Sequence, residues 1–283
     1  MQFFADTCHN PGVRISSPDH AGREYAMADR RVVLIIGASS DLGVELIREL
    51  DELEKRRQTG EMNSPRPLIL AHYGRNDAAV HQLRESCTHL EIEPLQADLS
   101  VHEEVCAMLD QIKEHALFPT HIVSFAAEKC QYMRISEWDS RRVQRDMEIQ
   151  FFSLAETFRV CLPEMAKRGY GKVVVMLSAY TITEPPKFLS NYTSVKYALL
   201  GLMRSAAAEY GGQGLNINGI SPAMIETKFL SGIGRKVREM NAESSPRHRN
   251  LTVKDVIPSV LYLLSDEAEF VNGINLNLTG QGA

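Results

Sequence analysis

The sequence predicts an α/β fold, with one doubly wound parallel sheet of about seven strands and helices on both faces. Short apolar runs alternate with longer amphipathic segments along most of the chain, which is typical of parallel strands joined by helices. The first run, Val32–Ile36, is continuously apolar, as expected of a strand buried on both faces. No linker divides the chain midway, so we expect a single main domain.

Each expected element has its own apolar pattern. The expected strands are Val32–Ile36, Leu68–His72, Glu91–Gln96, His121–Phe125, Lys172–Leu177, Leu215–Ile220 and Ile274–Leu278. The expected helices are Gly43–Arg57, Asp77–Ser86, Val101–His115, Glu137–Lys167, Asn191–Tyr210 and Val253–Leu264. Strand and helix follow each other regularly, so we expect the helices to cross over both faces of one sheet.

The composition excludes several classes of protein. The chain has 283 residues, of which 44% are hydrophobic and 24% are charged, as in ordinary globular proteins. A formal net charge of −5 argues against binding nucleic acid through bulk charge, and no apolar run is long enough to span a membrane. The five cysteines form no CxxC pair and no metal-like cluster. We therefore expect reduced thiols, no metal site and a cytoplasmic protein.

Two segments stand apart from the regular alternation. Residues 1–30 mix proline, glycine, histidine and charged residues without an apolar stretch of secretory length, so we expect a flexible polar extension rather than a signal peptide. Residues 31–283 then form the main domain. Within it, residues 223–252 form a long irregular stretch, and a loop of that length is usually functional or disordered.

A glycine-rich turn follows the first expected strand. Gly37 permits a sharp turn, and Gly43 allows the next helix to pack closely on the sheet. The free N–H groups at the start of that helix suit a pyrophosphate. Four residues between the two glycines are also expected to contact the cofactor: Ser39, Ser40, Asp41 and Leu42. Asp41 stands where a middle glycine is common, and it is also a suitable helix cap. An ordinary strand-to-helix turn remains the alternative.

The end of the second strand favours NADPH over NADH as the cofactor. A fold that binds NAD usually places an acidic residue there to hold the ribose 2′-hydroxyl, but this segment reads His72-Tyr73-Gly74-Arg75-Asn76. Arg75 suits a 2′-phosphate, although a solvated loop arginine gives the same pattern. After the third strand, Asp98 either contacts adenine or caps the helix beginning at Val101.

A tyrosine and a lysine lie four residues apart, and therefore on one face of a helix, at Tyr192 and Lys196. A nearby ammonium favours the phenolate, so we expect Lys196 to lower the pKa of Tyr192 by about 1–3 units. That change suits a general acid or base. The preceding strand ends at Ser178, and active sites of open α/β sheets lie beyond the carboxyl ends of strands. We therefore expect Ser178 and Tyr192 to meet one substrate oxygen.

Taken together, these motifs resemble the short-chain dehydrogenase/reductase family, and in particular its 3-oxoacyl-carrier-protein reductase-like branch. The resemblance covers residues 31–283 and implies a Rossmann-type domain. It rests on Gly37…Gly43, Asp98-Leu99, the strand ending at Ser178, Tyr192…Lys196, Asn218…Pro222…Thr227, Asn272-Gly273 and Gly280-Gln281-Gly282.

The resemblance implies a role for each motif. Tyr192 exchanges a proton with the substrate oxygen, Lys196 lowers the pKa of Tyr192 and binds the nicotinamide ribose, and Ser178 orients the substrate. Asn76 joins Arg75 on the 2′-phosphate. The segment that holds the nicotinamide includes Pro222, Ala223, Ile225 and Thr227. The helices Glu137–Lys167 and Asn191–Tyr210 are implied to pair across a two-fold axis, giving a homodimer or homotetramer.

The sequence also departs from the family pattern. The family motif N-N-A-G is replaced by Ser124-Phe125-Ala126-Ala127, in which the small residues Ala126 and Ala127 still permit close approach of the cofactor. The helix asparagine that anchors a catalytic water is replaced by Gln150, which carries the same amide group. Ser40 stands where NADP-binding members often have a basic residue, and Ala223 replaces the usual glycine after proline.

The resemblance also implies that residues 224–250 form a flap over the substrate. This segment holds six basic and three acidic residues, so it suits an anionic substrate arm such as phosphopantetheine, an acyl-CoA or a sugar phosphate. A solvated mobile loop is the alternative. Arg141, Arg142 and Arg145 form another basic group, equally open to either interpretation.

These observations favour an oxidoreductase that uses NADPH to reduce a small-molecule ketone, such as a thioester-linked 3-oxoacyl group, with Tyr192 as the proton donor. One alternative is an NAD-dependent alcohol, sugar or steroid dehydrogenase. Another is a weakly catalytic structural or regulatory subunit with the same fold, suggested by the altered Ser124–Ala127 segment and Gln150. The retained Ser178, Tyr192 and Lys196 argue against that last interpretation.

Overall fold

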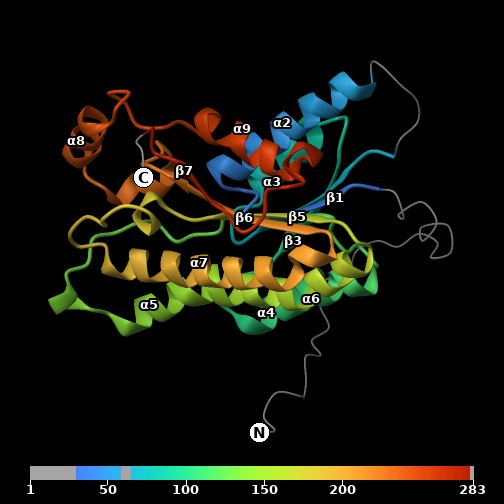
Figure 1. The fold of residues 1–283 in the computed structure, drawn as a ribbon, viewed down its shortest axis with the longest axis horizontal. Coiled ribbons are helices and arrows are strands. Elements are labelled where there is room, and N and C mark those ends of the chain that lie inside the picture. The colour runs from blue at the N-terminus through green and yellow to red at the C-terminus, as the bar shows by residue number, and fades with distance from the viewer. Residues whose placement is uncertain (1–29, 59–64, 281–283) are drawn as a thin grey trace, which may run out of the picture.

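One seven-stranded parallel sheet organises the protein (Figure 1). The computed structural model describes residues 30–58 and 65–280. The strand order is β3-β2-β1-β4-β5-β6-β7, and every neighbouring pair is parallel. The strands are β1 (Val32–Ile36), β2 (Leu68–Tyr73), β3 (Glu91–Gln96), β4 (His121–Ser124), β5 (Gly171–Met176), β6 (Leu215–Pro222) and β7 (Asn275–Leu278). The predicted fold class is confirmed.

Helices cover both faces of this sheet. The α-helices of the described chain are α2 (Asp41–Gln58), α3 (Ala78–Ser86), α4 (His102–Glu114), α5 (Ser140–Met147), α6 (Ser153–Lys167), α7 (Ser190–Tyr210), α8 (Arg235–Ser244) and α9 (Val253–Leu264). Figure 1 shows α4, α5, α6 and α7 on one face of the sheet and α2, α3 and α9 on the other. Successive β1 side chains enter the two cores alternately, with Leu34 in one and Ile35 in the other, as the pleat requires.

The expected helix Glu137–Lys167 is wrong as one continuous element. It is divided into α5, a π-helical turn over Glu148–Phe152, and α6. A π turn holds one more residue than an α turn and is frequent at functional sites. Here the turn contains Gln150, which is buried at 3% relative exposure. Apolar periodicity extends across such a turn, so the sequence pattern did not reveal the interruption.

The long segment 223–252 has regular structure of its own. It contains a 3₁₀ turn over Lys228–Gly232 and the helix α8. A bridge between Ile225 and Leu251 joins its two ends. It is therefore neither a simple loop nor disordered.

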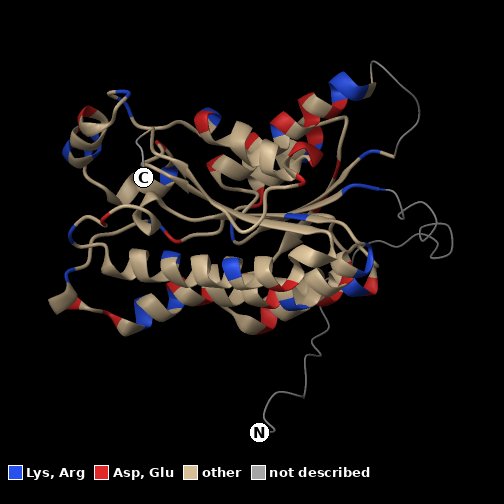
Figure 2. Ribbon diagram, viewed as in Figure 1, with Lys and Arg blue, Asp and Glu red and all other residues tan. Residues whose placement is uncertain are grey.

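The described residues also bear on the predicted extension, metal binding and membrane spans. The predicted extension lies outside them, apart from Arg30. Within residues 30–58 and 65–280, no group of three metal-ligating side chains occurs, and no helix is long and apolar enough to cross a membrane. Positive and negative residues are interspersed along the helices rather than separated onto opposite faces (Figure 2).

Candidate active site

The glycine turn between β1 and α2 is shaped by close backbone contacts. Gly37 has a φ of +85°, and a Cβ there would lie 3.0 Å from the backbone nitrogen of Ala126. A Cβ on Gly43 would lie 2.6 Å from the Ala38 carbonyl oxygen. The Ser40 hydroxyl donates to the Gly37 carbonyl at 2.7 Å and accepts from the Gly43 N–H at 3.1 Å. The turn therefore needs glycine at both ends, as predicted.

His72, which the sequence did not single out as functional, fixes this turn from the neighbouring strand. The Gly37 N–H donates to His72 Nδ1 at 3.0 Å, and His72 Nε2 lies 3.0 Å from the Ala97 carbonyl oxygen. Burial lowers the pKa of His72 to about 4. The ring is therefore neutral, with its hydrogen on Nε2. The sequence feature that could have indicated this role is a histidine at the end of an otherwise apolar strand.

Asp41 contacts the flap at the start of α2. Its Oδ2 accepts the Lys228 backbone N–H at 2.7 Å, and its Oδ1 lies 3.8 Å from Lys228 Nζ. The carboxylate that replaces the expected middle glycine thus connects the glycine turn to the segment after Thr227. The alternative that Asp41 caps its own helix does not account for these contacts.

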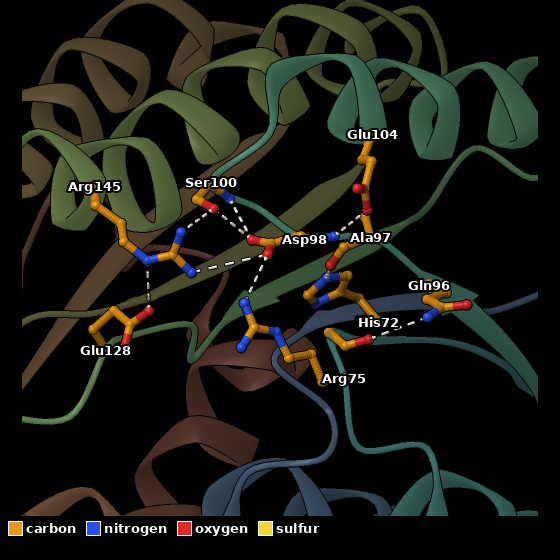
Figure 3. Close-up of polar contacts among 10 residues, drawn as sticks. His72, Arg75, Gln96, Ala97, Asp98, Ser100, Glu104, Glu128 and Arg145 are labelled. Atoms are coloured by element: carbon orange, nitrogen blue, oxygen red, sulfur yellow. Dashed lines mark hydrogen bonds and ion pairs between the residues drawn. The ribbon is translucent and has the colours of Figure 1, made fainter. Parts of the chain in front are cut away.

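Arg75 and Asp98 meet at the carboxyl ends of β2 and β3 (Figure 3). Arg75 Nη2 lies 3.5 Å from Asp98 Oδ2, and the Arg75 side chain is 84% exposed. Asp98 Oδ1 accepts hydrogen bonds from the Ser100 hydroxyl at 2.6 Å and the Ser100 N–H at 3.0 Å. These hydrogen bonds, with that of the hydroxyl the strongest, lower the pKa of Asp98. Asp98 is therefore ionised and held next to a largely exposed arginine.

A second arginine, Arg145 of α5, reaches the same cluster (Figure 3). Its Nη2 lies 3.8 Å from Asp98 Oδ2, its Nη1 donates to the Ser100 hydroxyl at 2.6 Å, and its Nε lies 3.2 Å from Glu128 Oε1. The sequence grouped Arg145 with Arg141 and Arg142 as an unassigned basic group. Only the tertiary structure brings it to the loops that follow β3 and β4.

Asn76 and Leu99 have local structural roles beside this cluster. Asn76 Oδ1 accepts the Ala78 N–H at 3.3 Å at the start of α3, while Leu99 is buried in the core. Asn76 follows β2 and Leu99 follows β3, so both lie at the carboxyl edge of the sheet.

Ser178, Tyr192 and Lys196 converge at the end of β5. Ser178 follows that strand, and Tyr192 and Lys196 come from successive turns at the start of α7. A hydrogen bond joins the side chains of Ser178 and Tyr192. Lys196 Nζ donates to the Met176 carbonyl oxygen at 2.8 Å and lies 5.7 Å from the centre of the Tyr192 ring. The predicted meeting of the three side chains is thus present.

The expected lowering of the Tyr192 pKa by Lys196 is wrong for this structure. Burial of the hydroxyl raises the pKa of Tyr192 well above its usual value, and the Ser178 hydrogen bond opposes that rise. Burial lowers the pKa of Lys196 to about 8. Desolvation disfavours the charged form of both groups, and here it outweighs any attraction between phenolate and ammonium.

A buried polar group lies behind Lys196, between α5, the π turn and α7. Gln150 Oε1 and Asn191 Oδ1 are both buried without a hydrogen-bond partner. Asp146 is also buried, and its Oδ2 accepts from Asn191 Nδ2 at 3.4 Å. The charge of Asp146 raises the pKa of Lys196, against the effect of burial. The sequence missed Asp146, because an aspartate in a polar helix normally faces solvent.

Most predicted site residues line one cavity of about 620 Å³ at the carboxyl edge of the sheet, where ligands of open α/β folds bind. These are Ser39, Ser40, Asp41, Leu42, Ala127, Ser178, Tyr192, Lys196, Pro222, Ala223, Ile225 and Thr227. The others do not line it. Gly37, Gly43 and Ala126 shape the backbone behind it, Arg75, Asn76, Asp98 and Leu99 lie along the neighbouring strand ends, and Gln150 lies in the π turn.

Comparison with known proteins places this geometry in a family. Residues 67–280 match the family model described as enoyl-(acyl carrier protein) reductase. The chain belongs to the short-chain dehydrogenase/reductase family. As a member, it is an NAD(P)-dependent oxidoreductase. The glycine turn, which leaves room for close backbone approach, and the exposed Arg75 fit such a cofactor.

Two similar proteins carry different names. The D-beta-hydroxybutyrate dehydrogenase of Rhizobium meliloti is 24% identical over 200 residues, covering 65% of this chain and 75% of the relative. A short-chain type dehydrogenase/reductase of Picea abies is 24% identical over 264 residues, covering 88% of this chain and 91% of the relative.

Solved structures of the family share the fold. A 3-oxoacyl-[acyl-carrier protein] reductase from Brucella melitensis has a TM-score of 0.75 at 21% identity, covering 96% of this chain and 98% of that chain. A gluconate 5-dehydrogenase from Burkholderia cenocepacia, in complex with NADP and tartrate, has a TM-score of 0.76 at 20% identity. The match covers 89% of this chain and 94% of that chain. At these identities the likeness concerns the fold alone.

Proposed function

We propose that this short-chain dehydrogenase/reductase uses NADPH to reduce a ketone to an alcohol, with Tyr192 as the proton donor. The observation that carries the proposal is the convergence of Ser178, Tyr192 and Lys196 in one cavity beside the glycine turn. Hydroxyl groups next to a buried ammonium suit protonation of an oxygen that gains negative charge.

The reacting groups have complementary tasks. Bound NADPH supplies the hydride that forms the new C–H bond at the carbonyl carbon. Ser178 donates a hydrogen bond to the carbonyl oxygen, and Tyr192 transfers its phenolic proton to that oxygen, which completes the alcohol. The Lys196 ammonium favours the phenolate left behind. Gln150, whose Oε1 is buried without a partner, accepts a hydrogen bond on the side from which the proton is replaced.

The preference for NADPH rests on the charges at the ends of β2 and β3. Arg75 is largely exposed and pairs only loosely with Asp98, at 3.5 Å. Because Arg145 also pairs with Asp98 and Ser100 donates a hydrogen bond to it, Asp98 offsets less of the Arg75 charge, which leaves Arg75 suited to a 2′-phosphate. The turn from Ser39 to Leu42 and the segment from Pro222 to Thr227 would hold the rest of the cofactor.

The direct test combines turnover with one variant. NADPH oxidation is followed with a panel of ketones and 3-oxoacyl thioesters, for wild type and Tyr192→Phe. We expect turnover for at least one carbonyl compound, and a loss of 10²-fold or more in kcat for the variant, because its ring keeps the packing but has no proton to give. No turnover with any compound, or equal rates for the two proteins, would overturn the proposal.

The cofactor preference has its own test. Arg75→Ala should raise the Kd for NADPH about tenfold, the worth of one hydrogen bond to a charged group, and leave that for NADH unchanged. Arg84→Ala, an exposed arginine on α3, is the matched control. Tighter binding of NADH than NADPH by wild type would favour the NAD-dependent dehydrogenase instead.

We also propose a dimer or tetramer built on α6 and α7. Phe152, just before α6, and Tyr197, on α7, are 46% and 50% exposed, and exposed apolar side chains on neighbouring helices suit a subunit interface. Cys87, Cys130 and Cys161 are free thiols, which supports a reducing compartment such as the cytoplasm. Sedimentation analysis of wild type and Tyr197→Glu tests the assembly, and a monomeric wild type would contradict it.

A further inference from the structure

The helix α8 turns one face towards the candidate active site. Val237, Met240, Asn241 and Ser244 of α8 line the cavity, and these positions lie on one side of a helix. Two of these side chains are apolar yet solvent-exposed, Val237 at 37% and Met240 at 59%. This face therefore presents apolar surface to the space above Tyr192.

The wall next to Tyr192 is also apolar and aromatic. The Tyr192 ring packs against Tyr180 at 6.3 Å and Phe229 at 6.0 Å between ring centres. Behind these rings, Leu230 and Ile233 belong to a small buried apolar cluster. The lining from the reacting hydroxyl to α8 thus consists mainly of carbon.

Few charges lie in the cavity wall, and most of them are already engaged. The charged lining residues are Asp41, Lys129, Lys196 and Lys228. Asp41 pairs with Lys228, and Lys196 donates to the Met176 carbonyl. The remaining one, Lys129, is exposed in the loop after β4 and pairs with no acidic side chain of the described chain. A charged substrate body would therefore meet little to compensate for the loss of its hydration.

Two basic residues of the flap, Arg238 and Arg249, are engaged away from the cavity. Arg238 Nη1 lies 3.1 Å from Glu226 Oε2, and Asn250 Nδ2 donates to Glu226 Oε1 at 2.6 Å. Arg249 makes two 2.7 Å contacts with Asp255. None of these side chains lines the cavity. These two arginines therefore do not present their charge to a ligand in the cavity, and Lys228, the flap cation that lines it, already pairs with Asp41.

We infer that the substrate is a neutral ketone with a large apolar body, which lies between Phe229 and the α8 face while its carbonyl meets Tyr192. Covering Val237 and Met240 removes apolar surface from water, which favours such a ligand. The flexible methionine side chain adapts to its shape. This inference rests on the proposed reductase function.

Three 3-oxo compounds separate apolar size from charge. Methyl 3-oxodecanoate is neutral with a long chain, methyl acetoacetate is neutral and short, and the 3-oxodecanoate anion has the long chain with a carboxylate. We expect kcat/KM for the long ester to exceed that for each of the other two by at least about tenfold. Equal values for the long ester and the anion, or for the two esters, would overturn the inference.

Substitutions on the two faces of α8 locate the effect. In the double variant Val237→Asn with Met240→Gln, the ratio of kcat/KM between the long and short esters should fall about tenfold. Lys236→Gln, on the face that does not line the cavity, is the control and should leave the ratio unchanged. An unchanged ratio in the double variant would contradict the placement on α8.

Calorimetry of methyl 3-oxodecanoate binding provides a readout without turnover. Wild type should bind with a negative heat-capacity change, the signature of apolar burial, and the double variant should bind more weakly. If no ester is reduced but this signature is present, the proposed reductase function fails while the binding inference holds. If wild type reduces the long ester but the double variant binds it as tightly as wild type does, the reductase function holds and the binding inference fails.

Discussion

The two edges of the sheet use the same types of residue for different purposes. At the amino edge, the Tyr170 hydroxyl donates to Asp266 Oδ1 at 2.9 Å, and Lys172 Nζ donates to Asn216 Oδ1 at 2.8 Å. Buried His121 lies 3.4 Å from the Tyr170 hydroxyl through Nε2. This edge thus holds a tyrosine, a lysine and a histidine that all have partners within the chain.

At the carboxyl edge, the corresponding groups face a cavity. Tyr192 and Lys196 line it, and nearby buried oxygens of Gln150 and Asn191 have no partner. Burial raises the tyrosine pKa at both edges, to about 12 for Tyr170 and further for Tyr192. A shifted pKa therefore does not by itself distinguish a catalytic tyrosine from a structural one. The open space that Tyr192 lines makes the distinction.

The two buried lysines give the sharpest test of this comparison. Lys196→Met should lower kcat for ketone reduction by about 10²-fold or more, because the phenolate of Tyr192 loses its neighbouring charge. Lys172→Met should leave kcat nearly unchanged and lower the free energy of unfolding by about 1–3 kcal/mol, because Asn216 Oδ1 loses its donor. Steady-state kinetics and urea denaturation measure both. A comparable loss of kcat in Lys172→Met would contradict the distinction between the two edges.

His72 tests whether the carboxyl edge also contributes to stability. Its pKa falls from 6.5 to about 4 on folding, so its contribution is present above pH 6.5 and is lost as the pH falls towards 4. Between pH 7.5 and 5.0, wild type should lose about 2 kcal/mol from this residue. His72→Gln lacks this loss, while His121 contributes equally in both proteins. Urea denaturation at the two pH values should therefore show a smaller difference for the variant; identical pH dependence would contradict the expectation.

The two aspartates provide a smaller contrast. Asp146 raises the pKa of Lys196, so Asp146→Asn should lower that pKa further below about 8. The alkaline limb of the pH profile of kcat/KM should then move to lower pH, by up to about one unit. At the amino edge, Asp266→Asn should lower the melting temperature without moving the profile. Rescue of the wild-type limb by Asp146→Glu would show that the charge is responsible.

Arg145 is expected to have the smallest effect. Without its charge, Asp98 pairs more strongly with Arg75, so Arg145→Ala should reduce the preference for NADPH over NADH about threefold, as expected for a surface ion pair. Arg141→Ala, a neighbouring arginine on α5, should leave the ratio of the two Kd values unchanged. An increased preference in Arg145→Ala would indicate that the two arginines compete rather than cooperate.

The class of fold and the outline of the site could be predicted from the order of residues along the chain. Alternating apolar runs and amphipathic helices dictate a parallel sheet, because each element must bury one surface against the other. The glycines at positions 37 and 43 and the Tyr192–Lys196 spacing are local features. Local features follow from backbone geometry and helix periodicity, which can be read along the chain.

The surroundings of these groups could not be predicted in the same way, because they depend on how distant segments pack. Asp146, Arg145 and His72 come close to the site through packing of segments distant in sequence, which no local pattern encodes. The interruption of the long helix at Gln150 is likewise a consequence of packing. So is the reversal of the expected Tyr192 pKa, because desolvation depends on all the atoms around a group and not on the one neighbour that the sequence reveals.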